Sequence, residues 1–350
     1  MSTTWANESM NIMTRKQPDY LRHNEALRKV AVIIPCYRVK AHIQGVIARI
    51  GGEVWRIYAV DDCCPEDSGD FIAAHCDDPR VRIIRNPVNT GVGGAVMAGY
   101  RAAIADGADI LVKIDGDGQM DPGFLPTMVA PIINGRADYT KGNRFYDLRH
   151  IHRMPATRLF GNAALSFMSK LSTGYWKLFD PTNGYTAIDA RVAAYLPLDR
   201  ISQRYFFETD MLFRLNTLRA MVVDVPMDAF YGDEQSNLHI RQIVFEFLGK
   251  HAKNFFKRIF YNYFLRDVSL ASLELLAGVL MLSFGVIFGL TQWYSAIATG
   301  EPTPLGTIML ATLPVLSGLQ FLLAFFSYDI SSTPTTGISE LLTPYPDKQE

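Results

Sequence analysis

The chain has 350 residues, of which 49% are hydrophobic and 20% are charged, and its formal net charge is −1. A near-neutral chain lacks the basic surface typical of nucleic-acid-binding proteins, and this aromatic and aliphatic content excludes an intrinsically disordered protein. The charges are unevenly spread, because no Lys or Arg occurs between Arg266 and Lys348. The chain therefore divides into a charged part and a nearly uncharged part.

The charged part begins with a polar N-terminal extension, residues 1–29, and continues with alternating apolar and amphipathic segments. Four apolar segments predict buried strands, at residues 29–35, 54–62, 80–86 and 108–118. The segments between them predict helices, at residues 41–50, 68–75 and 93–106. This alternation predicts a mostly parallel sheet with helices on both faces, which binds ligands beyond the carboxyl ends of its strands.

Acidic residues follow two of these strands. The second strand ends at Asp61 and Asp62, and the fourth is followed by Asp115, Asp117 and Gln119. An extended backbone would direct the last three side chains to one face. Two carboxylates and an amide oxygen suit Mg²⁺ or Mn²⁺, although an acidic turn with a helix-capping aspartate is the alternative interpretation. The sequence favours a divalent-metal site at this edge.

The end of the charged part is strongly basic. Residues 239–266 contain Lys and Arg interleaved with aromatic residues, which predicts amphipathic juxtamembrane helices lying on anionic headgroups. A solvated charged face is the other interpretation. The α/β domain is therefore expected to span residues 30–238.

The uncharged part contains two apolar runs within residues 267–328, at about 268–294 and 305–328. Each exceeds the roughly 20 residues that cross a bilayer; buried helices of a soluble core are the alternative. The turn between them has no Lys or Arg, so the positive-inside rule places the α/β domain and the tail, residues 329–350, in the cytoplasm. We expect an integral membrane protein, with the cell inner membrane favoured.

Eight short motifs occur in an order that resembles the inverting glycosyltransferases of the GT-A fold. They are VIIPCY, VDDCCPEDS, RNPVNTGVGGAVMAGYRAA, IDGDGQMDP, KGNRF, MPATRL, DPTNGYTAI and FFETDML. More narrowly, the chain resembles the polyprenyl-phosphate sugar transferases, the dolichol-phosphate mannose synthase-like group, in the subset with a two-helix C-terminal anchor.

The resemblance implies a Rossmann-like GT-A domain that transfers a single sugar from a nucleotide-sugar donor to undecaprenyl or dolichyl phosphate. The reaction would depend on Mg²⁺ or Mn²⁺, invert the anomeric configuration and occur at the cytoplasmic membrane face, in contact with membrane lipid. Val39 stands where the family commonly has Glu, which favours a UDP-sugar over GDP-mannose. The sugar, the prenyl chain and the oligomeric state, a homo-oligomer included, stay open.

The resemblance also implies roles for individual residues. The nucleotide would contact Pro35, Tyr37, Asp61, Asp62, Gly91, Gly93, Gly94 and Asp115. The metal would be held by Asp115, Asp117 and Gln119. The acceptor phosphate would be bound by Arg144 and Arg158. The acceptor and sugar cleft would be shaped by Asp180, Asn183, Gly184, Tyr185 and Glu208. The catalytic residues would be Asp117, Arg144 and Asp210, with Asp210 orienting the acceptor rather than deprotonating it.

Two rival interpretations differ in function. A processive polysaccharide synthase would usually carry a Q-x-x-R-W signature and more membrane spans, and the chain contains no such signature. A non-catalytic membrane scaffold with a degenerate transferase domain is disfavoured by the complete Asp115–Asp117–Gln119 set.

Overall fold

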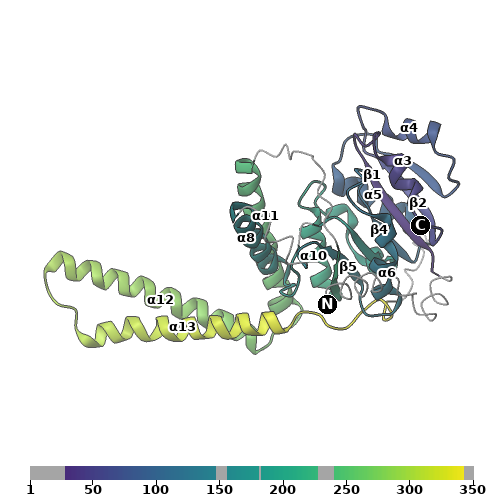
Figure 1. The fold of residues 1–350 in the computed structure, drawn as a ribbon. Coiled ribbons are helices and arrows are strands. Elements are labelled where there is room, and N and C mark those ends of the chain that lie inside the picture. The colour runs from purple at the N-terminus through teal and green to yellow at the C-terminus, as the bar shows by residue number, and fades with distance from the viewer. Residues whose placement is uncertain (1–27, 147–155, 181–182, 228–239, 343–350) are drawn as a thin grey trace, which may run out of the picture.

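The computed structural model describes residues 28–146, 156–180, 183–227 and 240–342, without the side chains of residues 156–160 and 240–244. Its α/β domain contains a seven-stranded sheet of order β3-β2-β1-β4-β6-β5-β7 (Figure 1). The strands are β1 Val30–Cys36, β2 Val54–Asp61, β3 Val81–Arg85, β4 Ile110–Lys113, β5 Tyr139–Asn143, β6 Thr186–Asp189 and β7 Val222–Pro226. Only β6 runs antiparallel to its neighbours among these strands. The predicted mostly parallel sheet is confirmed.

Helices cover both faces of the sheet because successive strand residues point to opposite sides. In β1, Val32 and Ile34 pack into one core cluster, and Ala31 and Ile33 pack into the other. The first cluster is covered by α3 Ile43–Ala48, α4 Ser68–His75 and α6 Leu125–Ile133. The second is covered by α5 Val92–Ala105, α9 Ala190–Tyr195 and α10 Phe207–Leu218. Two short 3₁₀ turns are Pro122–Phe124 and Leu198–Arg200.

Two further helices lie between this domain and the apolar hairpin (Figure 1). They are α8 Ala156–Thr173 and α11 Ile240–Phe260, and a π-helical turn, Tyr261–Leu265, continues α11. His251 of α11 is buried against α8, where its Nδ1 lies 2.8 Å from the Ser172 hydroxyl. The basic segment thus packs on the domain through one of its faces.

The apolar runs form a long helical hairpin that projects from the domain (Figure 1). Helices α12 Leu270–Thr299 and α13 Leu305–Ser331 have 30 and 27 residues, long and apolar enough to cross a membrane, and only 11% of each apolar window is buried. Such exposure is inconsistent with core helices of a soluble protein. The two helices approach closely at Gly318, where an added Cβ would lie 2.6 Å from the Leu282 nitrogen. Small residues at such a crossing are typical of membrane helix pairs.

A buried carboxylate ties the hairpin to the domain. Asp329, near the end of α13, forms a two-pronged ion pair with Arg258 of α11, at 2.6 and 3.0 Å, and both side chains are 1% exposed. The Tyr263 hydroxyl and the Trp176 Nε1 also donate to this carboxylate, at 2.7 and 2.9 Å. One side chain therefore joins α13 to α11, the π-helical turn and the segment that follows α8.

The chain after α13 returns to the sheet. The Asp138 carboxylate is fully buried and accepts hydrogen bonds from the backbone N–H groups of Ile338 and Ser339, at 3.0 and 2.8 Å, and of Met221 at 2.7 Å. Ile338 and Leu342 pack against the second core cluster. Both ends of the hairpin are thus attached to the α/β domain.

We expect Asp329→Ala to lower the free energy of unfolding by about 3–5 kcal/mol, because it leaves the Arg258 guanidinium buried without its counter-charge. Thermal unfolding of the purified protein in detergent measures the loss. Arg101→Ala is the control, because its ion pair with Asp199 is exposed and contributes less than about 1 kcal/mol. Equal losses for the two variants would contradict the role given to Asp329.

Candidate active site

Strand β4 carries a buried lysine to the carboxyl edge of the sheet. Lys113 is its last residue, and its side chain is 2% exposed. Its Nζ lies 2.7 Å from Oδ1 of Asp115 and 4.0 Å from Oε1 of Glu208, in the first turn of α10. One cation therefore holds two carboxylates together, one from the loop after a strand and one from a helix.

A second buried lysine comes from β5. Lys141 is fully buried, and its Nζ donates to the backbone oxygen of Asn183. Burial lowers the pKa of Lys141 to about 8, and the nearby carboxylates of Glu208, Asp180 and Asp224 oppose this shift. The ammonium form thus still predominates at neutral pH.

Glu208 faces both lysines. Burial raises its pKa to about 7, although Lys113 and Lys141 favour the charged form. Carboxyl groups whose pKa is shifted in this way by burial and specific charges are concentrated at functional sites. Glu208 therefore exchanges its proton near neutral pH, at the edge of the sheet where parallel strands bind ligands.

The sequence reasoning missed Lys113, Lys141 and Asp224. Burial raises the pKa of Asp224 to about 6, and Asn143 donates to its carboxylate at 3.1 Å. The available signal was Lys113 at the end of the apolar run ILVK, because lysine is almost never fully buried unless it is paired.

The acidic loop after β4 differs from the extended segment that the sequence suggested. Gly116 and Asp117 form a turn, Gly118 has a φ of +80°, and the Gln119 N–H donates to Oδ1 of Asp117 at 3.0 Å. The expectation of an extended backbone through Asp115, Asp117 and Gln119 was therefore wrong. Asp115 and Asp117 nevertheless remain partly exposed at the sheet edge.

This loop has the chemistry of a divalent-metal site. Hard cations such as Mg²⁺ are commonly bound by one or two carboxylates together with substrate phosphate oxygens, and Asp115 and Asp117 supply two partly exposed carboxylates. No cluster of three or more His, Cys, Asp or Glu side chains suited to a metal exists within the described ranges. These two carboxylates therefore fit a metal ion whose remaining ligands come from a bound diphosphate.

Arg144 follows β5 and is held by a buried carboxylate. Its Nε and Nη2 donate to Asp180 at 2.8 and 3.1 Å, and the Asp180 side chain is fully buried. One third of the Arg144 side chain stays exposed, at 34%. Asp180 thus fixes the guanidinium plane. Arg158, the second arginine expected at the acceptor phosphate, lies in α8 with a side chain outside the described part.

Asp61 and Asp62 organise loops. The Asp61 carboxylate accepts from the N–H groups of Cys64 and Gly69, at 2.8 and 2.7 Å. Asp62 is 2% exposed and accepts from Asn86 Nδ2 at 2.8 Å, from the Thr90 N–H and hydroxyl at 2.9 and 2.7 Å, and from the Gly91 N–H at 2.7 Å. Both carboxylates face backbone and loop donors, so they fix the loops that follow β2 and β3.

The glycines at the start of α5 face another segment of the chain. Gly91 has a φ of +82°, and an added Cβ would lie 2.8 Å from the Gln203 carbonyl oxygen. A Cβ on Gly93 would overlap the Ser202 carbonyl, and the Gly94 N–H donates to Gln203 at 3.0 Å. These glycines allow α5 to contact the loop before α10.

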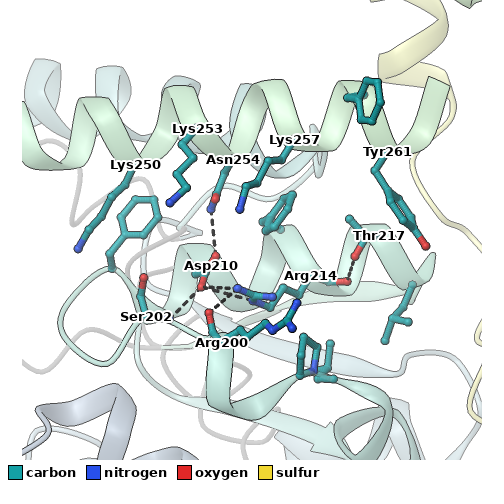
Figure 2. Close-up of a pocket in the computed structure, with 16 residues that line it drawn as sticks. Arg200, Ser202, Asp210, Arg214, Thr217, Lys250, Lys253, Asn254, Lys257 and Tyr261 are labelled. Atoms are coloured by element: carbon teal, nitrogen blue, oxygen red, sulfur yellow. Dashed lines mark hydrogen bonds and ion pairs between the residues drawn. The ribbon is translucent and has the colours of Figure 1, made fainter. Parts of the chain in front are cut away.

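Asp210 points away from the lysines, because two residues along a helix reverse the facing direction. It accepts from the Ser202 N–H at 2.9 Å and from Asn254 of α11 at 3.2 Å, and Arg214 lies 3.4 Å away (Figure 2). The expected catalytic Asp210 therefore joins α10 to α11, whereas Glu208 faces Asp115.

The remaining predicted residues divide between the site and the core. An added Cβ on Gly184 would lie 2.9 Å from Oδ2 of Asp115, so this glycine borders the acidic loop, as Asn183 borders Lys141. Tyr185 is fully buried, in the first core cluster. Pro35 is the half-buried residue before the end of β1, and Tyr37, just after β1, is 43% exposed.

Comparison with known proteins places this site in a family. The model of glycosyl transferase family 2 matches residues 31–196. An undecaprenyl-phosphate mannosyltransferase of Micrococcus luteus is 31% identical over 203 residues, which cover 57% of this chain and 82% of the relative. The chain belongs to glycosyl transferase family 2. A UDP-N-acetylglucosamine–dolichyl-phosphate N-acetylglucosaminyltransferase of Methanococcus voltae is 27% identical over 218 residues, 58% of this chain and 86% of that one.

Solved structures share the fold of this family 2 glycosyltransferase. Glucosyl-3-phosphoglycerate synthase of Mycobacterium tuberculosis in complex with UDP has a TM-score of 0.52 at 20% identity, over 70% of this chain and 86% of that one. The same enzyme with Mn²⁺, UDP-glucose and phosphoglyceric acid has a TM-score of 0.51 at 19% identity, over the same shares. The GT-A fold and the glycosyltransferase activity expected from the motifs are confirmed. Helix α10 lies beyond residues 31–196 matched by the family model, and the contacts of Glu208 with the site come from the structure.

We expect Glu208→Gln to lower kcat/KM for sugar transfer by about 10–100-fold, the cost of losing a hydrogen bond to a charged group. In the unsubstituted enzyme the carboxylate forms as the pH rises through about 7, so activity should rise across this interval. The variant lacks this carboxyl group, so the rise in kcat/KM through about pH 7 should be absent from its profile, and only the titrations of Asp224, with a pKa of about 6, and Lys141, with a pKa of about 8, should remain. The same rise in the variant would contradict the role of Glu208.

Asp210→Asn tests the opposite face of α10. We expect it to destabilise the protein by about 1–3 kcal/mol, because the Ser202, Asn254 and Arg214 donors lose a charged acceptor. We expect kcat to stay within about tenfold, because the Asp210 side chain faces α11 rather than Lys113 and Asp115. Thermal unfolding and steady-state kinetics measure the two effects, and a kcat loss matching that of Glu208→Gln, without destabilisation, would show that Asp210 is catalytic.

Proposed function

We propose that the protein transfers one sugar from a nucleotide-sugar donor to a polyprenyl phosphate, undecaprenyl or dolichyl phosphate, with inversion at the anomeric carbon. The names of the Micrococcus luteus and Methanococcus voltae relatives, which specify undecaprenyl and dolichyl phosphates, support this acceptor class. The observation that carries the proposal is the ion pair between Arg258 and Asp329, which locks a transferase domain to the base of an apolar hairpin. An enzyme held at the bilayer reaches an acceptor whose chain stays in the membrane.

The donor diphosphate would lie at the acidic loop, with Asp115 and Asp117 holding Mg²⁺ or Mn²⁺. A divalent cation there supplies neutralisation of the charge that develops on the leaving nucleoside diphosphate. A UDP-sugar donor is favoured by Val39, which is 8% exposed and places an apolar group where a Glu would contact guanine. The UDP and Mn²⁺ in the complexes of the structural neighbour and the UDP-sugar of the Methanococcus relative support the same choice. Pro35 and Tyr37 would contact the base, and Gln119 would be the third protein ligand of the metal.

The acceptor phosphate would be bound by Arg144, with Arg158 from α8 beside it. The Asp180 carboxylate orients the Arg144 guanidinium, as bidentate recognition of phosphate requires. An acceptor phosphate is already anionic, so it needs positioning more than a strong base. Lys113 and Lys141 add fixed positive charge beneath the reacting groups, and the ionised Glu208 would accept a hydrogen bond from a sugar hydroxyl.

The orientation in the membrane follows the charges. Both ends of the hairpin meet the α/β domain, and the basic α11 lies on the same side. The positive-inside rule therefore favours a cytoplasmic transferase domain and residues 300–304 on the opposite side of the cell inner membrane.

The test is a panel of UDP- and GDP-sugars incubated with full-length protein, undecaprenyl or dolichyl phosphate and Mg²⁺ or Mn²⁺. We expect a UDP-sugar to give a single-sugar lipid product of inverted configuration by NMR, and EDTA to abolish its formation. We expect Asp117→Asn to lower the rate by at least about 100-fold, and the surface control Arg101→Ala to retain it.

Two outcomes would contradict the proposal. A growing polysaccharide would identify a processive synthase, and transfer to a water-soluble acceptor with inert polyprenyl phosphate would identify another acceptor class.

A further inference from the structure

A pocket of about 630 Å³ lies between α10 and α11, outside the candidate active site (Figure 2). Its cationic lining residues are Arg200, Arg214, Lys250, Lys253 and Lys257, and its one acidic lining residue is Asp210. Five cations against one carboxylate give the pocket a net charge of about +4 at neutral pH. Such a concave basic site favours an anion.

The carboxylate in this pocket does not neutralise the lysines. Asp210 is 5% exposed and accepts from Ser202, Asn254 and Arg214. Lys253 and Lys257 are exposed and form no ion pair within the described ranges, whereas Lys250 pairs with Glu246 of α11 at 2.6 Å. In Figure 2 the side chains of Lys253 and Lys257 extend from α11 toward the side of the pocket where Asp210 and Arg214 lie.

Three different faces of α11 place this pocket at a membrane surface. An exposed apolar stripe runs along one face at helical spacing, through Phe245, Leu248, Phe256 and Phe260, which are 50–76% exposed. A second face is buried, through His251 and Asn254 against the domain and through Arg258 and Ile259 at the base of the hairpin. The third face carries Lys250, Lys253 and Lys257. A helix with an exposed apolar stripe beside a basic face lies at the boundary of acyl chains and headgroups.

The rest of the fold agrees with a position of the pocket at the boundary of acyl chains and headgroups. One end of α11 meets the base of the hairpin (Figure 1), and the aromatic end of the pocket, Phe260 and Tyr261, lies where α11 passes into the π-helical turn that leads to α12. Lysine stems extend from an apolar layer toward phosphate groups at such a boundary. The anion that meets the pocket first is therefore the phosphate of a bilayer lipid.

We propose that this pocket binds the phosphate of an anionic membrane phospholipid that is not a substrate, and that its occupancy promotes sugar transfer. The proposal rests on the proposed function, because its effect is on turnover. The lining comes from both helices, so a phosphate between Lys253, Lys257 and Arg214 would hold α10 against α11. Helix α10 carries Glu208 on its other face, so a change at the pocket reaches the carboxylate beside Asp115 and Lys113.

The test uses full-length protein in nanodiscs of phosphatidylcholine alone or with increasing phosphatidylglycerol, at saturating donor and acceptor. The hairpin is already inserted in every disc, so recruitment to the membrane does not contribute. We expect kcat to rise about fivefold or more with phosphatidylglycerol, the usual range of coupling between two sites. We expect Lys253→Gln/Lys257→Gln to lose this rise, and the charge-matched Arg49→Gln/Arg136→Gln control, on exposed positions of the α/β domain, to keep it.

Three results would overturn the lipid assignment. The first is an equal rise of kcat with phosphatidylglycerol in the double-lysine variant. The second is an increased KM for the acceptor in that variant in every lipid mixture, which would assign the pocket to the acceptor. The third is an increase of kcat in phosphatidylcholine discs when inorganic phosphate is added. Native mass spectrometry of phosphatidylglycerol retained by the two proteins separates this proposal from the function. If no lipid mixture supports transfer, the proposed function fails, and retention by the unsubstituted protein but not the variant still supports the pocket.

Discussion

The arrangement of this glycosyltransferase depends on one buried ion pair. Arg258 and Asp329 lie 71 residues apart in sequence, and each would be a costly buried charge without the other. Their geometry admits little movement, because the Asp329 carboxylate also accepts from Tyr263 and Trp176. The apolar hairpin is therefore an integral part of the fold, which sets the depth and tilt at which the transferase domain meets the bilayer.

Helix α10 connects the candidate active site to α11. Its first turn directs Glu208 to the buried lysines, and two residues later Asp210 faces α11. The lysines make the helix sensitive to its surroundings, because Lys113 and Lys141 are buried and depend on the placement of nearby carboxylates. A polar network of this kind is rigid when each member has its partners. Groups on the face of α10 that meets α11 therefore also affect the position of Glu208.

The sequence predicted the sheet, its cover of helices and the hairpin, because runs such as that of β1 bury both faces and two long stretches lack charge. It also located the acidic loop at the carboxyl edge. It did not distinguish Glu208 from Asp210, since the helix phase that separates them depends on where α10 begins. Asp61 and Asp62 were expected at the nucleotide, but carboxylates in loops also satisfy backbone N–H groups, and only the folded loop reveals the partners. Lys113 of β4 and Lys141 of β5 were not predicted as site residues, because only the folded sheet brings strands from distant segments together.

The attachment of the tail to Asp138 has a consequence for biogenesis. The donors to this carboxylate lie 200 and 201 residues later in the chain, beyond both apolar helices. During synthesis the α/β domain is complete in sequence long before Ile338 and Ser339 emerge, and its buried carboxylate lacks these partners until then. The last step of folding therefore waits for the hairpin to be made and turned back, so a chain with a wrongly inserted hairpin carries a buried carboxylate that lacks two of its backbone donors.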